Sequence, residues 1–320
     1  MRKEVIFSYE TPFSGEHNIY GYIYGGGTED KPNPRADKSA AIVGAMRGNE
    51  YQQLYICSLL SKKLAELEED GDIVQGKSIL IIPSVNYSAL NAGHKFWLSD
   101  DSDINREFPG NPDGPATSRL AYSLLEMLKE YTYGIQLPSF YMQGKFIPHV
   151  RMMKTGHEST NLANLFGLPF VLMNDMRSFD EGTLNYNWQL AGTEAFSIYS
   201  GGTDRIEEKF ADRAVYAILR FLSRMGIIKY NSMGGNISTT MDEEDMINIK
   251  SGDAGFFRDK VGVNTEVHRG EVLAEIVDPM DGHVKSQVFA PTDGIIFFAQ
   301  DQPLVYENVV IYKMIRKLHK

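Results

Sequence analysis

The fold of this chain is decided by two stretches, Asp103-Ile104-Asn105-Arg106-Glu107-Phe108-Pro109-Gly110 and Ala40-Ala41-Ile42-Val43-Gly44-Ala45-Met46-Arg47-Gly48-Asn49-Glu50-Tyr51. The apolar run 40–46 predicts a buried strand, and apolar residues at helical spacing predict that a helix follows it. These apolar residues are Leu54, Cys57, Leu60, Leu64 and Leu67. Arg47 and Glu50 are therefore expected at a junction between a strand and a helix.

Apolar runs of strand type alternate with segments of helical period between about residues 40 and 226. Further strands are predicted at 78–83, 133–137, 170–173 and 195–199. Further helices are predicted from Pro115, which suits a first helical position, and from about Arg205 to Gly226. Continuous apolar strands interleaved with helices predict an α/β domain with a mostly parallel or mixed sheet covered on both faces.

The composition changes after this region. Residues 231–245 are rich in Gly, Ser, Thr and acidic side chains, which is typical of a linker. Short β-rich segments separated by turns follow, at 255–257, 272–277, 288–296 and 305–312. The sequence therefore predicts an α/β domain over residues 1–240 and a β-rich domain over residues 241–320.

Charge and composition argue against several kinds of partner, a disulfide and a membrane-spanning segment. With 32 basic and 42 acidic residues in 320, the net charge is -10, which disfavours nucleic acid and an anionic membrane surface as partners. Cys57 is the only cysteine, so no intrachain disulfide is expected. The start of the chain lacks the apolar core of a signal peptide, and no apolar run approaches the roughly 20 residues that span a bilayer. A cytoplasmic protein is expected.

The two opening stretches together resemble the signature segments of the succinylglutamate desuccinylase/aspartoacylase family of zinc-dependent amidohydrolases. In that family the first segment reads Asp-x-Asn-Arg-x-Phe-Pro-Gly, which implies that Asn105 and Arg106 hold the substrate. The resemblance also implies a zinc-carboxypeptidase-like mixed sheet flanked by helices. The β-rich residues 241–320 resemble the lipoyl/biotinyl-like β-sandwich that members commonly carry at the C-terminus.

The resemblance fails where the family performs its chemistry. The family holds zinc with two His residues and one Glu, and a second Glu acts as general base. Glu50 matches the carboxylate ligand, but Arg47 and Pro138, which follows Gln136 and Leu137, stand at the two His positions. Tyr199 stands at the general-base position, and a phenol with an ordinary pKa of about 10 is a poor base at neutral pH. Zinc is therefore not expected as a cofactor.

Arg47 lies three residues before Glu50, so we expect a bidentate pair between them in the space that zinc would fill. The leading interpretation is a divergent family member that is zinc-free and binds a small carboxylate or phosphate through Arg47, Asn105 and Arg106. Arg106 could instead brace its own loop through backbone carbonyls.

Two further interpretations stay open. One is an active metal-dependent deacylase of N-acyl amino acids that uses a shifted set of residues, with Glu50, His149 and Arg106 taking part and zinc as cofactor. The other is a non-catalytic scaffold or subunit. A homo-oligomer is compatible with each of these interpretations.

Overall fold

The computed structural model describes residues 1–11, 15–26, 37–232 and 234–317. The chain divides into two compact units. The first comprises residues 1–139 and 148–240, and the second comprises residues 140–147 and 241–320. The division therefore differs from the expected single boundary near residue 240, because residues 140–147 leave the first unit and belong to the second.

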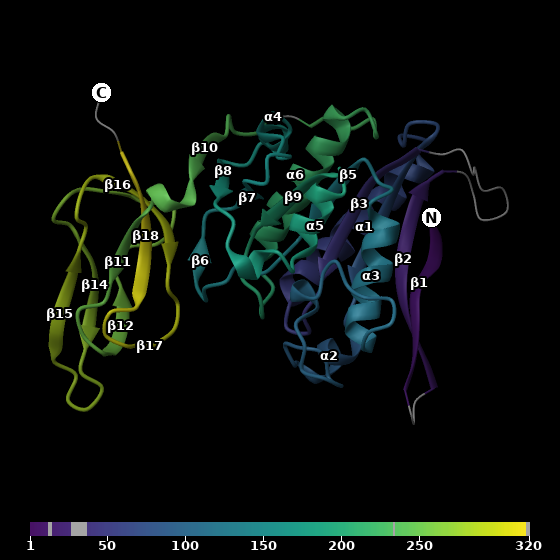
Figure 1. Cartoon of the computed structure of the whole chain (residues 1–320). Helices are drawn as coiled ribbons and strands as arrows, with labels where there is room; N and C mark the ends of the chain where they lie inside the picture. The colour runs from purple at the N-terminus through teal and green to yellow at the C-terminus, as the bar shows by residue number, and fades with distance from the viewer. Residues whose placement is uncertain (12–14, 27–36, 233, 318–320) are drawn as a thin grey trace. The chain divides into compact units, whose positions relative to one another are not determined.

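A nine-stranded mixed sheet forms the centre of the first unit (Figure 1). Its strands, in spatial order, are β1 (Arg2–Thr11), β2 (Gly15–Gly25), β4 (Lys77–Ser84), β3 (Asp37–Ala45), β5 (Tyr133–Gln136), β9 (Glu194–Tyr199), β7 (His149–Met153), β8 (Phe170–Asn174) and β10 (Thr239–Asp242). Strands β4, β3, β5 and β9 are parallel to one another, whereas β1, β2 and β7 introduce antiparallel pairs. This arrangement confirms the predicted mixed sheet.

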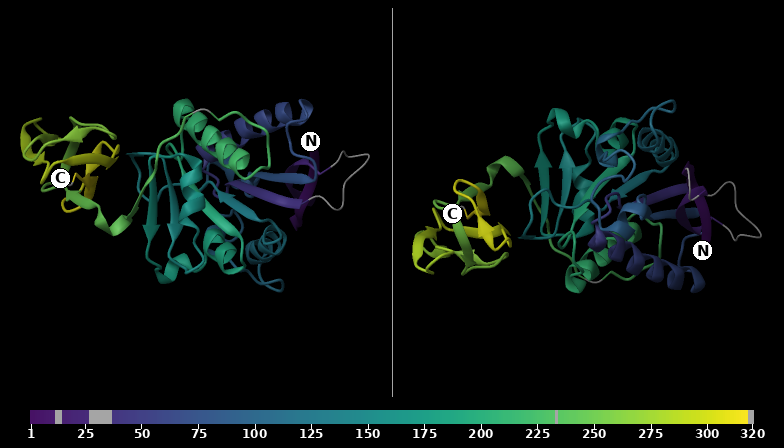
Figure 2. Two further views of the ribbon diagram at one scale, coloured as in Figure 1. Left: turned by 90° about the horizontal axis from the view of Figure 1, so that it is seen from above. Right: turned by 90° about the horizontal axis from the view of Figure 1, so that it is seen from below.

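Helices cover both faces of this sheet. Helices α1 (Tyr51–Glu69) and α6 (Glu208–Arg224) share one apolar cluster, and α3 (Ala116–Leu128) and α5 (Leu184–Leu190) share another. Figure 2 shows α1 and α6 on one side of the sheet and α3 on the other. Successive side chains of a strand point to opposite faces, so Ala40 and Ile42 of β3 join the first cluster, and Ala41 and Val43 join the second. This alternation explains why β3 carries no polar side chain from Ala40 to Ala45.

Shorter helical segments connect the strands. They are α2 (Tyr87–Ala92), η1 (Ile104–Arg106), α4 (Thr160–Ala163), η2 (Asn164–Phe166), η3 (Ser178–Asp180) and η4 (Glu243–Asp245). The segment η1 falls within the quoted 103–110 stretch, and the Asp103 side chain caps it by accepting the Asn105 N–H at 3.1 Å. None of the helices within the described ranges is both long and apolar enough to cross a bilayer.

The second unit is built from two sheets around one apolar cluster. One sheet has the order β11 (Ile247–Lys250), β18 (Val310–Arg316), β16 (Gly294–Ala299) and β13 (Glu266–Val267), and β6 (Lys145–Phe146) also pairs with β16. The other has the order β15 (Val284–Phe289), β14 (Val272–Val277), β12 (Gly255–Asp259) and β17 (Leu304–Val305). Leu273 and Ile276 from one sheet and Ile296 and Met314 from the other are fully buried in the shared cluster.

Residues 140–147 belong to the second unit because of their aromatic and polar contacts. The Phe140 ring lies 4.7 Å from that of Phe146 and 5.8 Å from that of Phe298. The Tyr141 hydroxyl donates to Glu243 at 2.7 Å, and the same carboxylate accepts from the buried Lys313 ammonium at 2.7 Å. Such contacts between distant segments have no periodic signature in the sequence, so local patterns alone predict these residues in the first domain.

Candidate functional site

The candidate site lies where three parallel strands end. Val43 of β3 pairs with Gln136 of β5, and Gln136 pairs with Ser197 of β9, so the carboxyl ends of these strands are neighbours. Arg47 and Glu50 lie in the connection after β3, and Pro138 follows β5. Carboxyl ends of parallel strands are the usual location of ligand sites in α/β proteins because the connecting loops converge there.

Arg47 is held in this edge by two carboxylates. Its Nη2 donates to Asp103 Oδ2 at 2.7 Å and its Nε to Asp103 Oδ1 at 3.1 Å, which is a bidentate pair. Its Nη1 donates to Glu50 Oε1 at 3.3 Å and to the Ser139 hydroxyl at 3.2 Å. The side chain is 10% exposed. Burial alone would lower the pKa of the guanidinium, but the nearby Glu50 and Asp103 carboxylates outweigh burial and raise the pKa above its ordinary value.

The Arg47–Glu50 geometry corrects one expectation. Glu50 receives a single side-chain N–H from Arg47, and the bidentate partner is Asp103. The three-residue spacing between Arg47 and Glu50 indicates neither Asp103 nor Ser139, so both partners were missed from the sequence. Asp103 is the first residue of the quoted 103–110 stretch, so its carboxylate was the one sequence signal for a partner of Arg47.

Glu50 is buried with both carboxylate oxygens occupied. Its Oε2 accepts the backbone N–H groups of Met46 at 2.8 Å and Arg47 at 3.0 Å. Its Oε1 accepts the Ser139 hydroxyl at 2.7 Å and the Ser139 N–H at 3.3 Å, in addition to the Arg47 contact. A carboxylate offers about four lone-pair directions, so five donors leave none for a metal ion.

The residues at this edge do not fit zinc. Arg47 cannot deprotonate near neutral pH, Pro138 has no side-chain donor atom, and Glu50 is saturated. In the described parts of the chain, no group of three or more His, Cys, Asp or Glu side chains is placed to hold a metal ion. A shifted metal site built on Glu50 and His149 therefore lacks a third ligand among those residues.

His149 instead packs against Tyr199. Both lie at strand ends, paired across β7 and β9, and their rings stack at 5.1 Å with an interplanar angle of 5°. The Arg151 guanidinium lies 5.9 Å from the same Tyr199 ring. His149 is fully buried and Tyr199 is 8% exposed, so Tyr199, which the family resemblance places at the general-base position, is a packed aromatic ring.

Asn105 and Arg106 have different environments. The Asn105 side chain is buried, and its Oδ1 accepts from Gln136 Nε2 and from the Leu184 N–H, each at 3.1 Å. Arg106 is exposed; its Nη1 donates to the Asn105 carbonyl at 2.7 Å, as the bracing interpretation predicts. Its guanidinium lies 5.5 Å from the centre of the exposed Phe179 ring.

Comparison with known proteins assigns the family. A sequence profile of the succinylglutamate desuccinylase/aspartoacylase catalytic domain matches residues 36–225, more than half of the chain. The chain belongs to this family. The matched region contains the Arg47, Asp103 and Ser139 cluster and the whole carboxyl edge of the parallel strands.

Individual relatives agree with this assignment. The chain is 36% identical over 83 residues to an N-alpha-acetyl-L-2,4-diaminobutyric acid deacetylase from Halomonas elongata, a match that covers 26% of this chain and only 22% of that protein. A succinylglutamate desuccinylase/aspartoacylase structure from Rhodobacter sphaeroides aligns with a TM-score of 0.74 and 20% identity over 96% of this chain and 91% of that one.

A second solved structure gives the same result. The product-bound ectoine utilization protein EutE (DoeB) from Ruegeria pomeroyi aligns with a TM-score of 0.74 and 19% identity, over 96% of this chain and 92% of that chain. At these identities the structural likeness establishes the fold alone.

Proposed function

We propose that this chain is a zinc-free member of the desuccinylase/aspartoacylase family that binds a small carboxylate or phosphate and does not hydrolyse amides by the metal mechanism of its relatives. The observation that carries the proposal is the saturated Glu50 carboxylate, with Arg47 beside it at the position of a histidine ligand. A fixed guanidinium at this place repels an incoming divalent cation.

The anion is assigned to Arg106. Arg47 directs its Nε and Nη1 groups and one Nη2 N–H to protein acceptors, and the Asn105 amide oxygen already accepts two hydrogen bonds. Arg106 is exposed and makes one such contact, and Arg177 lies on the same Phe179 ring at 5.8 Å. Two exposed guanidinium groups beside one ring provide the paired N–H donors that carboxylates and phosphates accept.

A thermal-shift titration with succinate, phosphate and N-acetyl-L-aspartate tests this assignment. At least one of these anions is expected to raise the melting temperature of the first unit, and Arg106→Ala is expected to remove the shift. Arg119→Ala is the matched control, because Arg119 is also exposed and lies on α3. No shift with any of the three anions, or an equal shift in Arg106→Ala, would refute the assignment.

A second candidate function is metal-dependent deacylation of N-acyl amino acids. It is favoured by the family and by the local similarity to a diaminobutyric acid deacetylase. Release of amine from N-acetyl amino acids in the presence of added zinc, abolished in Glu50→Ala, would establish this function in place of the first. We expect no release above the rate of a heat-denatured sample.

We further infer that the second unit is a lipoyl/biotinyl-like β-sandwich. The support is its two antiparallel sheets around a single apolar cluster and the turn-rich segments between its strands.

A further inference from the structure

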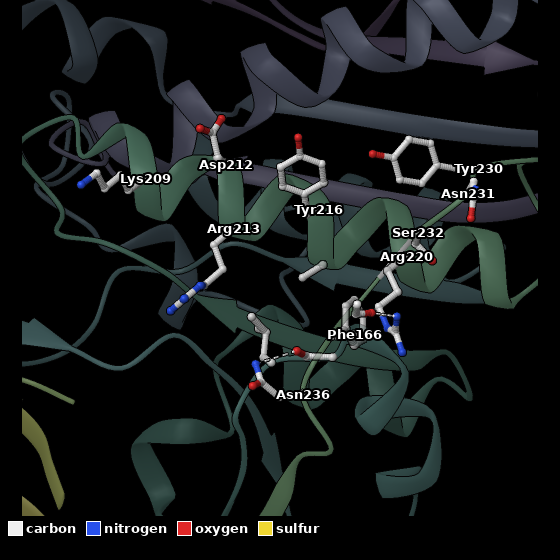
Figure 3. A pocket seen from close by; sticks show the side chains of 15 residues that line it. Phe166, Lys209, Asp212, Arg213, Tyr216, Arg220, Tyr230, Asn231, Ser232 and Asn236 are labelled. Carbon is white, nitrogen blue, oxygen red and sulfur yellow. Dashed lines mark hydrogen bonds between the residues drawn. The ribbon is translucent and has the colours of Figure 1, made fainter. Parts of the chain in front are cut away.

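A cavity of about 620 Å³ lies over the outward face of α6 (Figure 3). Its other walls are residues 166–168, 230–232 and 234–236. None of its lining residues belongs to the cluster of Arg47, Glu50, Asp103 and Ser139. The volume is in the range of about 300–1,000 Å³ that is typical of small-molecule sites.

The cavity is formed around Arg220, which packs against two glycines. A Cβ on Gly167 would lie 2.8 Å from Arg220 Nε, and one on Gly235 would lie 2.8 Å from its Cζ. Arg220 Nη1 donates to the Gly234 carbonyl. Asn236 ties the same segment to Gly167, whose carbonyl accepts the Asn236 N–H at 2.9 Å. The backbone therefore encloses the guanidinium closely, which only residues without a Cβ permit.

The charge of the cavity is opposite to that of the protein. Lys209, Arg213 and Arg220 contribute three positive charges and Asp212 one negative charge, which leaves a net +2 in a chain of net -10. Within the described residues, Lys209 and Arg213 form no ion pair, and the buried Arg220 Nε has no hydrogen-bond partner. Unpaired cations gathered in a concave site attract anions.

Aromatic side chains form the other edge of the cavity. In Figure 3, Asp212 and Tyr216 extend from one edge of α6, and Arg213 and Arg220 extend from the other. Tyr216 is 62% exposed, which is high for an aromatic residue, and Tyr230 lies near it in the same lining. Exposed aromatic rings beside cations provide a surface on which a planar group can stack.

We propose that this cavity binds a small anion that carries a flat ring, such as a nucleoside monophosphate. Arg213 and Arg220 hold the anionic group, and Tyr216 and Tyr230 hold the ring. This site is separate from the carboxylate or phosphate site proposed at Arg106, and it does not depend on that proposal.

Isothermal titration calorimetry of the full chain with AMP tests the proposal, with inorganic phosphate and adenosine as separate probes. AMP is expected to bind with one saturable site and more tightly than either phosphate or adenosine. Arg213→Gln is expected to weaken AMP binding about tenfold or more, because it removes a charge-assisted contact. Tyr216→Ala is expected to weaken it about fivefold or more through lost stacking.

Arg224→Gln is the matched control, because Arg224 is an exposed arginine in the last turn of the same helix and does not line the cavity. Arg224→Gln and Arg106→Ala are both expected to bind AMP as the wild type does. The proposal is overturned if AMP shows no saturable binding up to about 5 mM. It is equally overturned if Arg213→Gln binds as the wild type does, or if phosphate alone binds as tightly as AMP.

Discussion

Replacing Arg47 by Met removes the cation that two carboxylates share while keeping most of the side-chain volume. The Arg47, Glu50 and Asp103 side chains are 10%, 2% and 18% exposed. Removing one partner of a buried ion pair costs about 3–5 kcal/mol, because the remaining charge stays buried without compensation. Glu50 keeps four other donors. The free energy of unfolding is therefore expected to fall by about 3 kcal/mol, at the lower end of that range.

Urea unfolding at neutral pH, followed by tryptophan fluorescence, measures this loss. Trp97 and Trp188, the only two tryptophans, both lie in the first unit, so their emission reports on the unit that contains Arg47. The double variant Arg47→Met with Asp103→Asn removes one of the two uncompensated charges. It is expected to recover about 1 kcal/mol relative to the single variant.

Two outcomes would refute this reasoning. One is a single variant within about 0.5 kcal/mol of the wild type, which is the size of an ordinary surface substitution. The other is a double variant that is no more stable than Arg47→Met alone, because the loss would then not arise from uncompensated carboxylates.

Two further predictions concern the first unit. Burial, and then the nearby Glu4 and Glu130, raise the pKa of the Tyr131 phenol from 10.0 to about 12, so the folded state keeps a proton that the unfolded chain loses. This stabilisation is complete below about pH 10 and is lost as the pH rises to about 12. In urea unfolding, Tyr131→Phe should therefore reduce the decline of the free energy of unfolding over that interval by about 1–2 kcal/mol. An unchanged decline would contradict this prediction. Gly167→Ala should reduce the free energy of unfolding by about 2 kcal/mol, because the residue has a positive φ and its new Cβ would meet Arg220. Gly192→Ala should reduce it by about 1 kcal/mol, because Gly192 also has a positive φ but has no atom near its Cβ position. Equal losses in urea unfolding would show that the Arg220 contact is not tight.

The sequence was sufficient for the architecture of the first unit because that architecture depends on periodicity. The fully apolar run of β3 and the helical spacing of Leu60 and Leu64 in α1 both record burial against a layer above and a layer below. The strand-to-helix junction at Arg47 and Glu50 follows from the same pattern. The N-terminal hairpin of β1 and β2 was not predicted, since its strands are only partly buried and lack an apolar run.

The sequence did not determine the partners within the site. Asp103 lies 56 residues from Arg47, and Ser139 lies 89 residues from Glu50, so no local spacing connects them. These contacts form because the chain brings the ends of β3 and β5 and the 103–106 segment together in space. The cavity on α6 is also a tertiary feature, because it requires residues 166–168, 230–232 and 234–236 to meet the same helix.

Zinc content is the most direct test of the claim that Arg47 has replaced the metal centre. The protein, purified without a metal-affinity step, incubated with zinc and desalted, should contain well under one zinc per chain by elemental mass spectrometry. Arg47→His alone should not change this result, because Pro138, which the family resemblance places at the second ligand position, has no side-chain donor atom. Zinc near one per chain in the wild type, lost in Glu50→Ala, would contradict the account.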